Sequence, residues 1–350
     1  MTPHPIEKVT VTSPVSVQNL TIFPLIQSKV SGPEYIASSV AIEKHGMQVT
    51  EISDGGSVPN LLVKNPSEHS ILLLDGEELW GAKQNRIINT TILLAPRSKT
   101  MIDVSCTESG RWSSISPTFS HSGSVMNTKA RRRKMRSVSS SLQAYAQFNS
   151  DQGEVWDEVS DLHMKVGSQS PTSAMADAYH KVREDLDSAV EKMPVQENQC
   201  GMIVMIDGKP AGMDLLSRND VYEELHAQLL KSYAMEAIAN KRQQMLSPRR
   251  KKLEQAQQQP APDELAAKAF FERCAAIKGK SYRSVGVGMD WRFVDESLVG
   301  SGLEVDDTWI HMAYFVDEAD ADSSNPRRAR MSRMSERRRY HRRDDDDRVY

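Results

Sequence analysis

The sequence predicts an α+β fold, because strand-like and helix-like patterns occupy separate parts of the chain. In the early part, short apolar segments separated by Pro, Asn and Ser recur about every ten residues, which is typical of an antiparallel, sandwich-like sheet. In the middle, longer segments carry apolar residues three and four positions apart, as amphipathic helices do. Strand patterns then return before residue 317. We therefore expect a strand-rich antiparallel N-terminal half and a mixed helix and strand C-terminal half.

These changes in pattern divide the chain. We assign 1–13 to a flexible N-terminus, 14–126 to the strand-rich half, 127–150 to a basic connector, 151–317 to the mixed half and 318–350 to a disordered tail. Within the mixed half, 241–262 is rich in Gln and in charge, and we expect a mobile insert there. The tail holds nine arginines between Arg327 and Arg343, then DDDD, with hardly any apolar residues.

Composition excludes several classes of protein. Hydrophobic residues make up 39% of the chain and charged residues 26%, as in ordinary globular proteins, and the net charge of −3 argues against wholesale nucleic-acid binding. No apolar run reaches the roughly 18 residues of a membrane span, and the N-terminus has no hydrophobic signal core. The cysteines, Cys106, Cys200 and Cys274, are widely spaced, so we expect reduced thiols in a cytoplasmic protein.

The strand-rich half is expected to begin with a strand pair at 15–27, broken at Pro24. A short helix at 38–45, ended by Gly46, precedes the strand MQVTEIS, which DGGS turns. The segments VPNLLVKN, ILLLDGEEL, RIINTTILLA and KTMIDVSC complete the sheet. Strands this apolar are buried on both faces, so the polar residues between them should lie at strand ends.

The basic run KARRRKMR at 129–136 is expected to be a solvated lead-in to a helix. Helices are then predicted at 154–166, from Ser170 to Met193, from Ser217 to Ile238 and at 263–277. A hairpin at 201–216 turns at Asp207 and Gly208. Strands close the fold in RSVGVGMDWRF, LVGSGLEV and TWIHMAYFV.

The stretch 72–112 concentrates polar residues between strongly apolar strands. Ten positions hold Glu77, Glu78, Lys83, Gln84, Asn85 and Arg86, and one strand later come Cys106, Glu108, Arg111 and Trp112. A solvated loop does not need such bulky and varied hydrogen-bonding side chains bracketed by LLLD, TILLA and MIDVSC. The sequence therefore predicts a ligand site at this lip of the sheet.

The carboxylates of the stretch are the catalytic candidates. Glu77 and Glu78 are neighbours, so in an extended segment they point to opposite faces and at most one of them lines a pocket. Glu78 and Glu108, from different strands, could form an acid/base pair whose pKa values are separated by burial and proximity. An ion pair between a carboxylate and Lys83 or Arg86 is the alternative role.

Three cations, Lys83, Arg86 and Arg111, accompany the amides of Gln84 and Asn85. Guanidinium groups hold phosphate or carboxylate through paired donors, so this set fits a phosphorylated ligand rich in hydrogen-bonding groups. The alternative is that the arginines brace loops by binding carbonyls and glutamates. The sequence has no glycine-rich phosphate loop.

The remaining polar residues have similar alternatives. Cys106, at a strand end, is placed as a nucleophile would be, although a buried structural cysteine is far commoner. Trp112 could stack on a ring of the ligand, or it could be a packing lid. His311 fits a satisfied sheet histidine better than a ligand-binding one. No motif indicates a metal site, and we predict no cofactor.

Several motifs resemble the domain family described as ARG and rhodanese-phosphatase-superfamily-associated protein, where ARG stands for ADP-ribosylglycohydrolase. They are LLLDGEELWGAKQNRIINTTILLAP, VSCTESGRW, GMIVMIDGKPAGMDLL, KSYAMEAI, VGVGMDWRF, LVGSGLEV and IHMAYF. The resemblance covers roughly residues 15–315 and leaves out the tail. The family name records association with ADP-ribose-processing and phosphatase-like enzymes. The resemblance therefore implies chemistry linked to ADP-ribose, NAD or nucleotides.

Two functions from different classes follow. The first is an intracellular domain that binds, or acts on, a nucleotide- or ADP-ribose-like phosphorylated ligand at the 77–86/106–112 lip. The second is a noncatalytic interaction or regulatory protein in which the same residues form a structural network. The basic run and the Arg-rich tail suit weak contacts with acidic partners better than specific nucleic-acid recognition. Side chains converging on open space favour the first function, and mutually bonded side chains favour the second.

Overall fold

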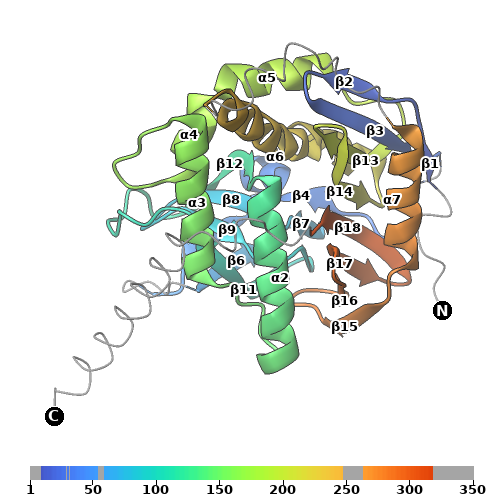
Figure 1. Ribbon diagram of the computed structural model, residues 1–350. Coiled ribbons are helices and arrows are strands. Elements are labelled where there is room, and N and C mark those ends of the chain that lie inside the picture. Colours follow the sequence, from blue (N-terminus) through green and yellow to red (C-terminus); the bar gives the residue numbers. More distant parts are fainter. Residues whose placement is uncertain (1–8, 29, 31, 54–58, 247–262, 318–350) are drawn as a thin grey trace.

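The computed structural model describes residues 9–28, 30, 32–53, 59–246 and 263–317. The predicted tail, most of the predicted insert and the start of the predicted N-terminal segment lie outside these residues. The fold is α+β, as predicted, with seven helices and eighteen strands in the described parts of the chain (Figure 1).

A nine-stranded antiparallel sheet draws strands from both ends of the chain. Its order is β1 (Thr10–Val11), β3 (Leu20–Ile26), β13 (Gln199–Ile206), β14 (Lys209–Leu216), β18 (Thr308–Val316), β17 (Leu298–Val305), β16 (Met289–Val294) and β15 (Gly279–Arg283), with β2 (Val15–Val17) also paired to β3. Strand β3 pairs with β13 along its whole length, from Leu20 opposite Ile206 to Ile26 opposite Gln199. The first strands of the chain therefore complete a sheet built mostly from the C-terminal half.

The strand-rich segment between β3 and β13 closes into a barrel. Its strands are β5 (Gln48–Glu51), β6 (Asn60–Asn65), β11 (Ser98–Cys106), β9 (Arg86–Ile88), β8 (Glu77–Gly81) and β12 (Phe119–Val125). A small sheet of β4 (Ile36–Ala37), β7 (Ile71–Leu73) and β10 (Ile92–Leu94) packs on the same apolar core. Leu73 and Ile92 pair antiparallel, as expected, whereas Val104 belongs to the barrel and meets them only through this core.

The helices lie on both faces of the large sheet and beside the barrel, where α1 (Ser38–Lys44) packs. The others are α2 (Thr128–Tyr145), α3 (Gln152–Val166), α4 (Met175–Lys181), α5 (Arg183–Lys192), α6 (Asn219–Leu246) and α7 (Glu264–Ala276). Helix α7 lies against one face, where Phe270, Phe271 and Cys274 join the sheet core (Figure 1). Helices α2, α3 and α6 share the core on the other face. None of the helices described is long and apolar enough to cross a membrane.

Two helix predictions need correction. The single helix predicted from Ser170 to Met193 is two helices, because Val182 has φ −118° and ψ 21°, which ends α4 and begins α5. The basic run is not a solvated lead-in. It lies inside α2, and the side chains of Arg131 and Lys134 are buried.

Candidate functional site

The barrel wall separates the predicted site residues into two groups. Arg86 on β9 lies opposite both Leu79 on β8 and Cys106 on β11, and residues directly opposite on paired strands point to the same face. Leu79 is part of the barrel core, so Arg86 and Cys106 point into the barrel. Glu78 lies opposite Ile87, which belongs to the core outside the barrel. The structure therefore does not bring Glu78 and Arg86 to one face.

Arg86, Gln84, Cys106 and Glu51 form a polar group inside the barrel, which we name the Arg86 end. The Arg86 guanidinium is fully buried, and its Nη1 donates to Gln84 Oε1 at 2.9 Å and to Cys106 Sγ at 2.6 Å. Its Nη2 lies 3.9 Å from Glu51 Oε1. Among the described residues, Arg86 Nε and Nη2 find no acceptor, and neither oxygen of Glu51 finds a donor.

Trp112 and Lys83 lie over this group. The Trp112 ring centre is 5.9 Å from Arg86 Cζ and 5.5 Å from Lys83 Nζ, within the range of cation–π contacts. The Trp112 side chain is 49% exposed. It therefore covers Arg86 and Lys83 from the solvent side and is not part of the barrel core.

The Cys106 thiol is poorly suited to nucleophilic chemistry. Burial raises its pKa to about 11, and the nearby Arg86 guanidinium only partly offsets this effect. At neutral pH the group is a thiol, whereas the thiolate is the reactive form. The structure therefore favours the structural role for Cys106 over the nucleophilic one.

Arg111, Glu108 and Asn85 satisfy one another beside the Arg86 end. Arg111 donates to Glu108 at 2.6 and 3.0 Å and to the carbonyl of Ala82 at 2.6 Å. Glu108 also accepts from the backbone of Asn85 at 3.2 Å. Burial would raise the pKa of Glu108, but Arg111 and its other donors hold it below its usual value. These contacts fit the bracing role that was the alternative for Arg111.

Glu78 is fully buried on the outer side of the barrel wall. Its Oε1 accepts from the Thr107 hydroxyl at 2.9 Å, and no described donor reaches Oε2 within hydrogen-bonding geometry. Burial raises its pKa to about 7; the Thr107 and Ser122 hydroxyls oppose that shift, and the charge of Glu108 adds to it. The pKa values of Glu78 and Glu108 thus move in opposite directions, and the acid/base pair stays a prediction.

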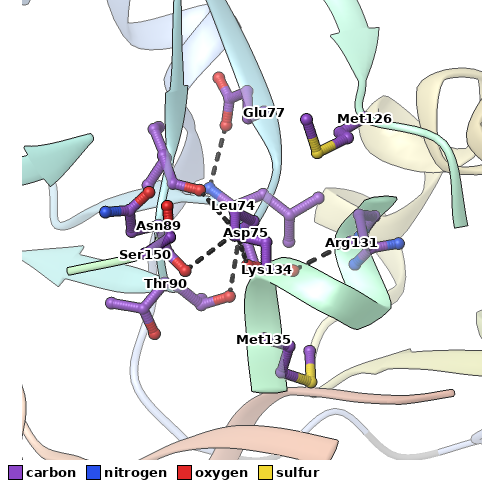
Figure 2. Close-up of polar contacts among 12 residues, drawn as sticks. Leu74, Asp75, Glu77, Asn89, Thr90, Met126, Arg131, Lys134, Met135 and Ser150 are labelled. Carbon is purple, nitrogen blue, oxygen red and sulfur yellow. Dashed lines mark hydrogen bonds and ion pairs between the residues drawn. The ribbon is translucent and has the colours of Figure 1, made fainter. Parts of the chain in front are cut away.

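Glu77 has different partners from those of the Arg86 end and of Arg111. It is fully buried, accepts from the Leu74 backbone at 2.9 Å and from the Ser38 hydroxyl, and lies 3.0 Å from His121 Nε2 (Figure 2 shows the bond to Leu74). Burial alone would lower the pKa of His121, but the Glu77 carboxylate raises it. Glu77 therefore anchors α1 and β12 to the turn that precedes β8.

A buried network of charged side chains was missed from the sequence. Arg131 binds both oxygens of Asp214, at 2.7 and 3.0 Å, and lies 3.4 Å from Asp75. Lys134 binds Asp75 and the carbonyls of Ile88 and Asn89, at 3.0 and 2.9 Å. Figure 2 shows Arg131 and Lys134 of α2 converging on Asp75. A signal was present, because Arg131 lies four and seven positions before Met135 and Val138, on the apolar stripe of the helix.

The same network reaches the closing strands of the large sheet. Asp214 also accepts from Tyr233 at 2.7 Å and lies 3.1 Å from His311, whose other ring nitrogen meets the Thr91 hydroxyl at 2.8 Å. His311 is thus a satisfied sheet histidine, as expected. Thr90 meets the carboxylate of Asp290 at 2.6 Å. These contacts join the barrel side of the molecule to the large sheet.

A model of the ARG and Rhodanese-Phosphatase-superfamily-associated Protein domain matches residues 8–315. The chain belongs to this family. The match confirms the resemblance seen in the motifs, and it runs from β1 into β18. Neither curated proteins nor solved structures give a match.

Besides the Arg86 end, the structure has a polar cavity of about 450 Å³ between α2, α3, α6 and the β13–β14 hairpin. Its lining includes the cations Lys129, Arg132, Lys165 and Lys209. Lys129 and Lys165 share Asp161, at 2.8 and 3.3 Å, and Arg132 lies 3.5 Å from Asp317. Most of the cations that line this cavity are therefore paired with carboxylates. In the parts of the chain that are described, no cluster of three or more His, Cys, Asp or Glu is placed to hold a metal ion.

Proposed function

We propose that this domain binds a phosphorylated small molecule, of the nucleotide or ADP-ribose type, at the Arg86 end of the barrel. The observation that carries the proposal is the fully buried Arg86 guanidinium, whose Nε and Nη2 have no hydrogen-bond acceptor among the described residues, the ion pair of Nη2 with Glu51 being 3.9 Å long. Leaving such donors unpaired in the interior costs about 1–3 kcal/mol each, and more for a charged group. A phosphate supplies paired acceptors to a guanidinium through two parallel hydrogen bonds.

The residues around Arg86 suit such a ligand. Gln84 and Cys106 fix Nη1 and so orient the other two nitrogens. Lys83 adds a second positive charge near the Trp112 ring. In the proposed complex, Trp112 moves aside and stacks on the base or sugar ring of the ligand. Asn85, Glu108 and Arg111 hold the loop that carries these groups and do not contact the ligand.

The family name agrees with this ligand class, since it records association with ADP-ribosylglycohydrolase proteins. That association is an analogy, whereas the unpaired donors of Arg86 are a physical reason. Glu78 points away from the barrel interior, so it does not contact a ligand bound at the Arg86 end.

The proposal is tested by titrating ADP-ribose, ADP and inorganic phosphate into the full chain by calorimetry and by thermal shift. We expect ADP-ribose or ADP to raise the melting temperature, because a ligand that binds only the folded state stabilises it. Arg86→Lys should weaken binding roughly ten- to a hundredfold, since an ammonium cannot reproduce paired donors.

The matched control is Arg111→Lys. Arg111 is engaged with Glu108 and backbone carbonyls, so this change should lower the melting temperature more than it lowers affinity. The proposal fails if no phosphorylated ligand shifts the wild-type protein and Arg86→Lys lowers only its stability. In that case the Arg86 end is a structural network.

A further inference from the structure

We infer that the ligand at the Arg86 end carries neighbouring hydroxyl groups that donate hydrogen bonds to Glu51, so that the site selects phosphorylated sugars with free hydroxyls. This inference rests on the proposed function, and it adds Glu51 as the residue that determines specificity.

Glu51 points toward the Arg86 end because of its position in the alternation of side chains along β5. It lies two positions after Val49, a core residue of the barrel, so its side chain points to the same inner face. Its side chain is 12% exposed. In the segment MQVTEIS, a charged residue stands where the alternation of side chains would place an apolar one. This was a signal in the sequence, but Glu51 was not among the predicted site residues.

The Glu51 carboxylate needs donors that the described residues do not provide. Both of its oxygens are shielded from solvent and accept no hydrogen bond. Arg86 does not supply one, because Nη1 is engaged with Gln84 and Cys106, and Nη2, at 3.9 Å, is beyond hydrogen-bonding range. An ionised carboxylate accepts up to about four hydrogen bonds, and burial without them is costly.

Arg86 and Glu51 together restrict which chemical groups the ligand can carry. Arg86 requires acceptors, whereas Glu51 requires donors, and Nη2 of Arg86 lies 3.9 Å from Oε1 of Glu51. A bare phosphate beside Glu51 would place two negative charges together, and a cationic ligand would be repelled by Arg86. Neutral hydroxyl groups attached to a phosphate satisfy both side chains. A carboxylate that binds ribose hydroxyls is also the arrangement found in dinucleotide-binding folds.

The experiment compares ribose 5-phosphate, 2-deoxyribose 5-phosphate and inorganic phosphate by calorimetry. The wild-type chain should bind ribose 5-phosphate at least about tenfold more tightly than its deoxy analogue, since a site built to bind a hydroxyl rejects a ligand that lacks it. Glu51→Gln should remove most of this discrimination and leave phosphate binding unchanged or tighter. The control, Glu68→Gln, changes an exposed glutamate paired with Arg97 and should change neither.

The outcomes separate this inference from the proposed function. Equal affinity for the two sugar phosphates, with binding still dependent on Arg86, overturns the role of Glu51 and leaves the phosphate site in place. If none of the three compounds binds, ADP-ribose and ADP do not bind either, and Arg86→Lys alters only stability, both fail, and a direct Arg86–Glu51 ion pair is the better description. If Glu51→Gln does not fold, the comparison of the two sugars on the wild-type protein still decides.

Discussion

At the scale of single residues, Glu78 shows how burial sets the behaviour of a carboxyl group. Burial raises its pKa to about 7 from 4.5. Between these two pH values the folded protein binds more protons than the unfolded chain. The free energy of unfolding therefore falls as pH rises through this window, and the stability that Glu78 contributes below it is lost above pH 7. The shift corresponds to a decrease in the free energy of unfolding on the order of 3 kcal/mol.

Glu78→Gln should remove this component of the pH dependence. The glutamine keeps an oxygen that accepts from Thr107, and it carries no charge to desolvate. We therefore expect the variant to gain stability relative to wild type at pH 8 and to gain little at pH 5, measured by urea unfolding. Equal differences at the two pH values would show that Glu78 is ionised in the fold at neutral pH.

Residue patterns predicted part of the candidate site. The opposite directions of Glu77 and Glu78 follow from strand geometry and are confirmed by their contacts with Leu74 and Thr107. The convergence of Glu51 on Arg86 was not predicted, because it depends on how β5 and β9 meet across the barrel. That arrangement is a property of barrel closure, which local sequence does not encode.

At the scale of elements, α2 departs most from expectation. A run of basic residues normally faces solvent, since burying an unpaired charge is costly. Here the compensating carboxylates are distant in the chain: Asp75 lies 56 residues before Arg131, and Asp214 lies 83 residues after it. A local pattern cannot reveal partners so far apart. Strands, in contrast, depend on neighbouring residues, and many of them were predicted. The exceptions are that β3 runs through Pro24, and that ILLLDGEEL and RIINTTILLA are each two strands in different sheets.

Arg131→Met should destabilise the protein by about 3–5 kcal/mol, because it leaves the buried carboxylate of Asp214 without its main cation and removes the more distant of the two cations beside Asp75. The measurement is the free energy of unfolding in urea. The matched control is Arg183→Met, which removes an exposed pair with Asp187 on α5 and should cost less than about 1 kcal/mol. Similar losses in the two variants would mean that the Arg131 network is not desolvated in solution.

At the scale of the whole molecule, the chain order joins the barrel to the large sheet. Strand β3 leaves the sheet, the barrel and α2 to α5 follow, and β13 returns beside β3. The α+β class could be predicted because strand and helix patterns are segregated along the chain. The division into sheet and barrel could not, because β1 to β3 resemble the strands that follow them and differ only in their distant partners.

The last prediction is that barrel and sheet unfold in one transition. Thr90 meets Asp290, Thr91 meets His311, and Arg131 joins Asp75 to Asp214, so unfolding either part strips buried charged groups in the other of their partners.

Two single-tryptophan proteins report on the parts, one with Trp80 on β8 and one with Trp291 on β16, the other four tryptophans being replaced by Phe. In each protein the fluorescence midpoint in urea should coincide with the midpoint from circular dichroism. Because both midpoints are measured on the same protein, a change in stability caused by the Phe substitutions does not affect the comparison. A Trp80 transition that precedes loss of helical signal would show that the barrel opens independently. The charge network would then hold α2 to the sheet without coupling the two parts, and ligand binding at the Arg86 end would stabilise the barrel alone.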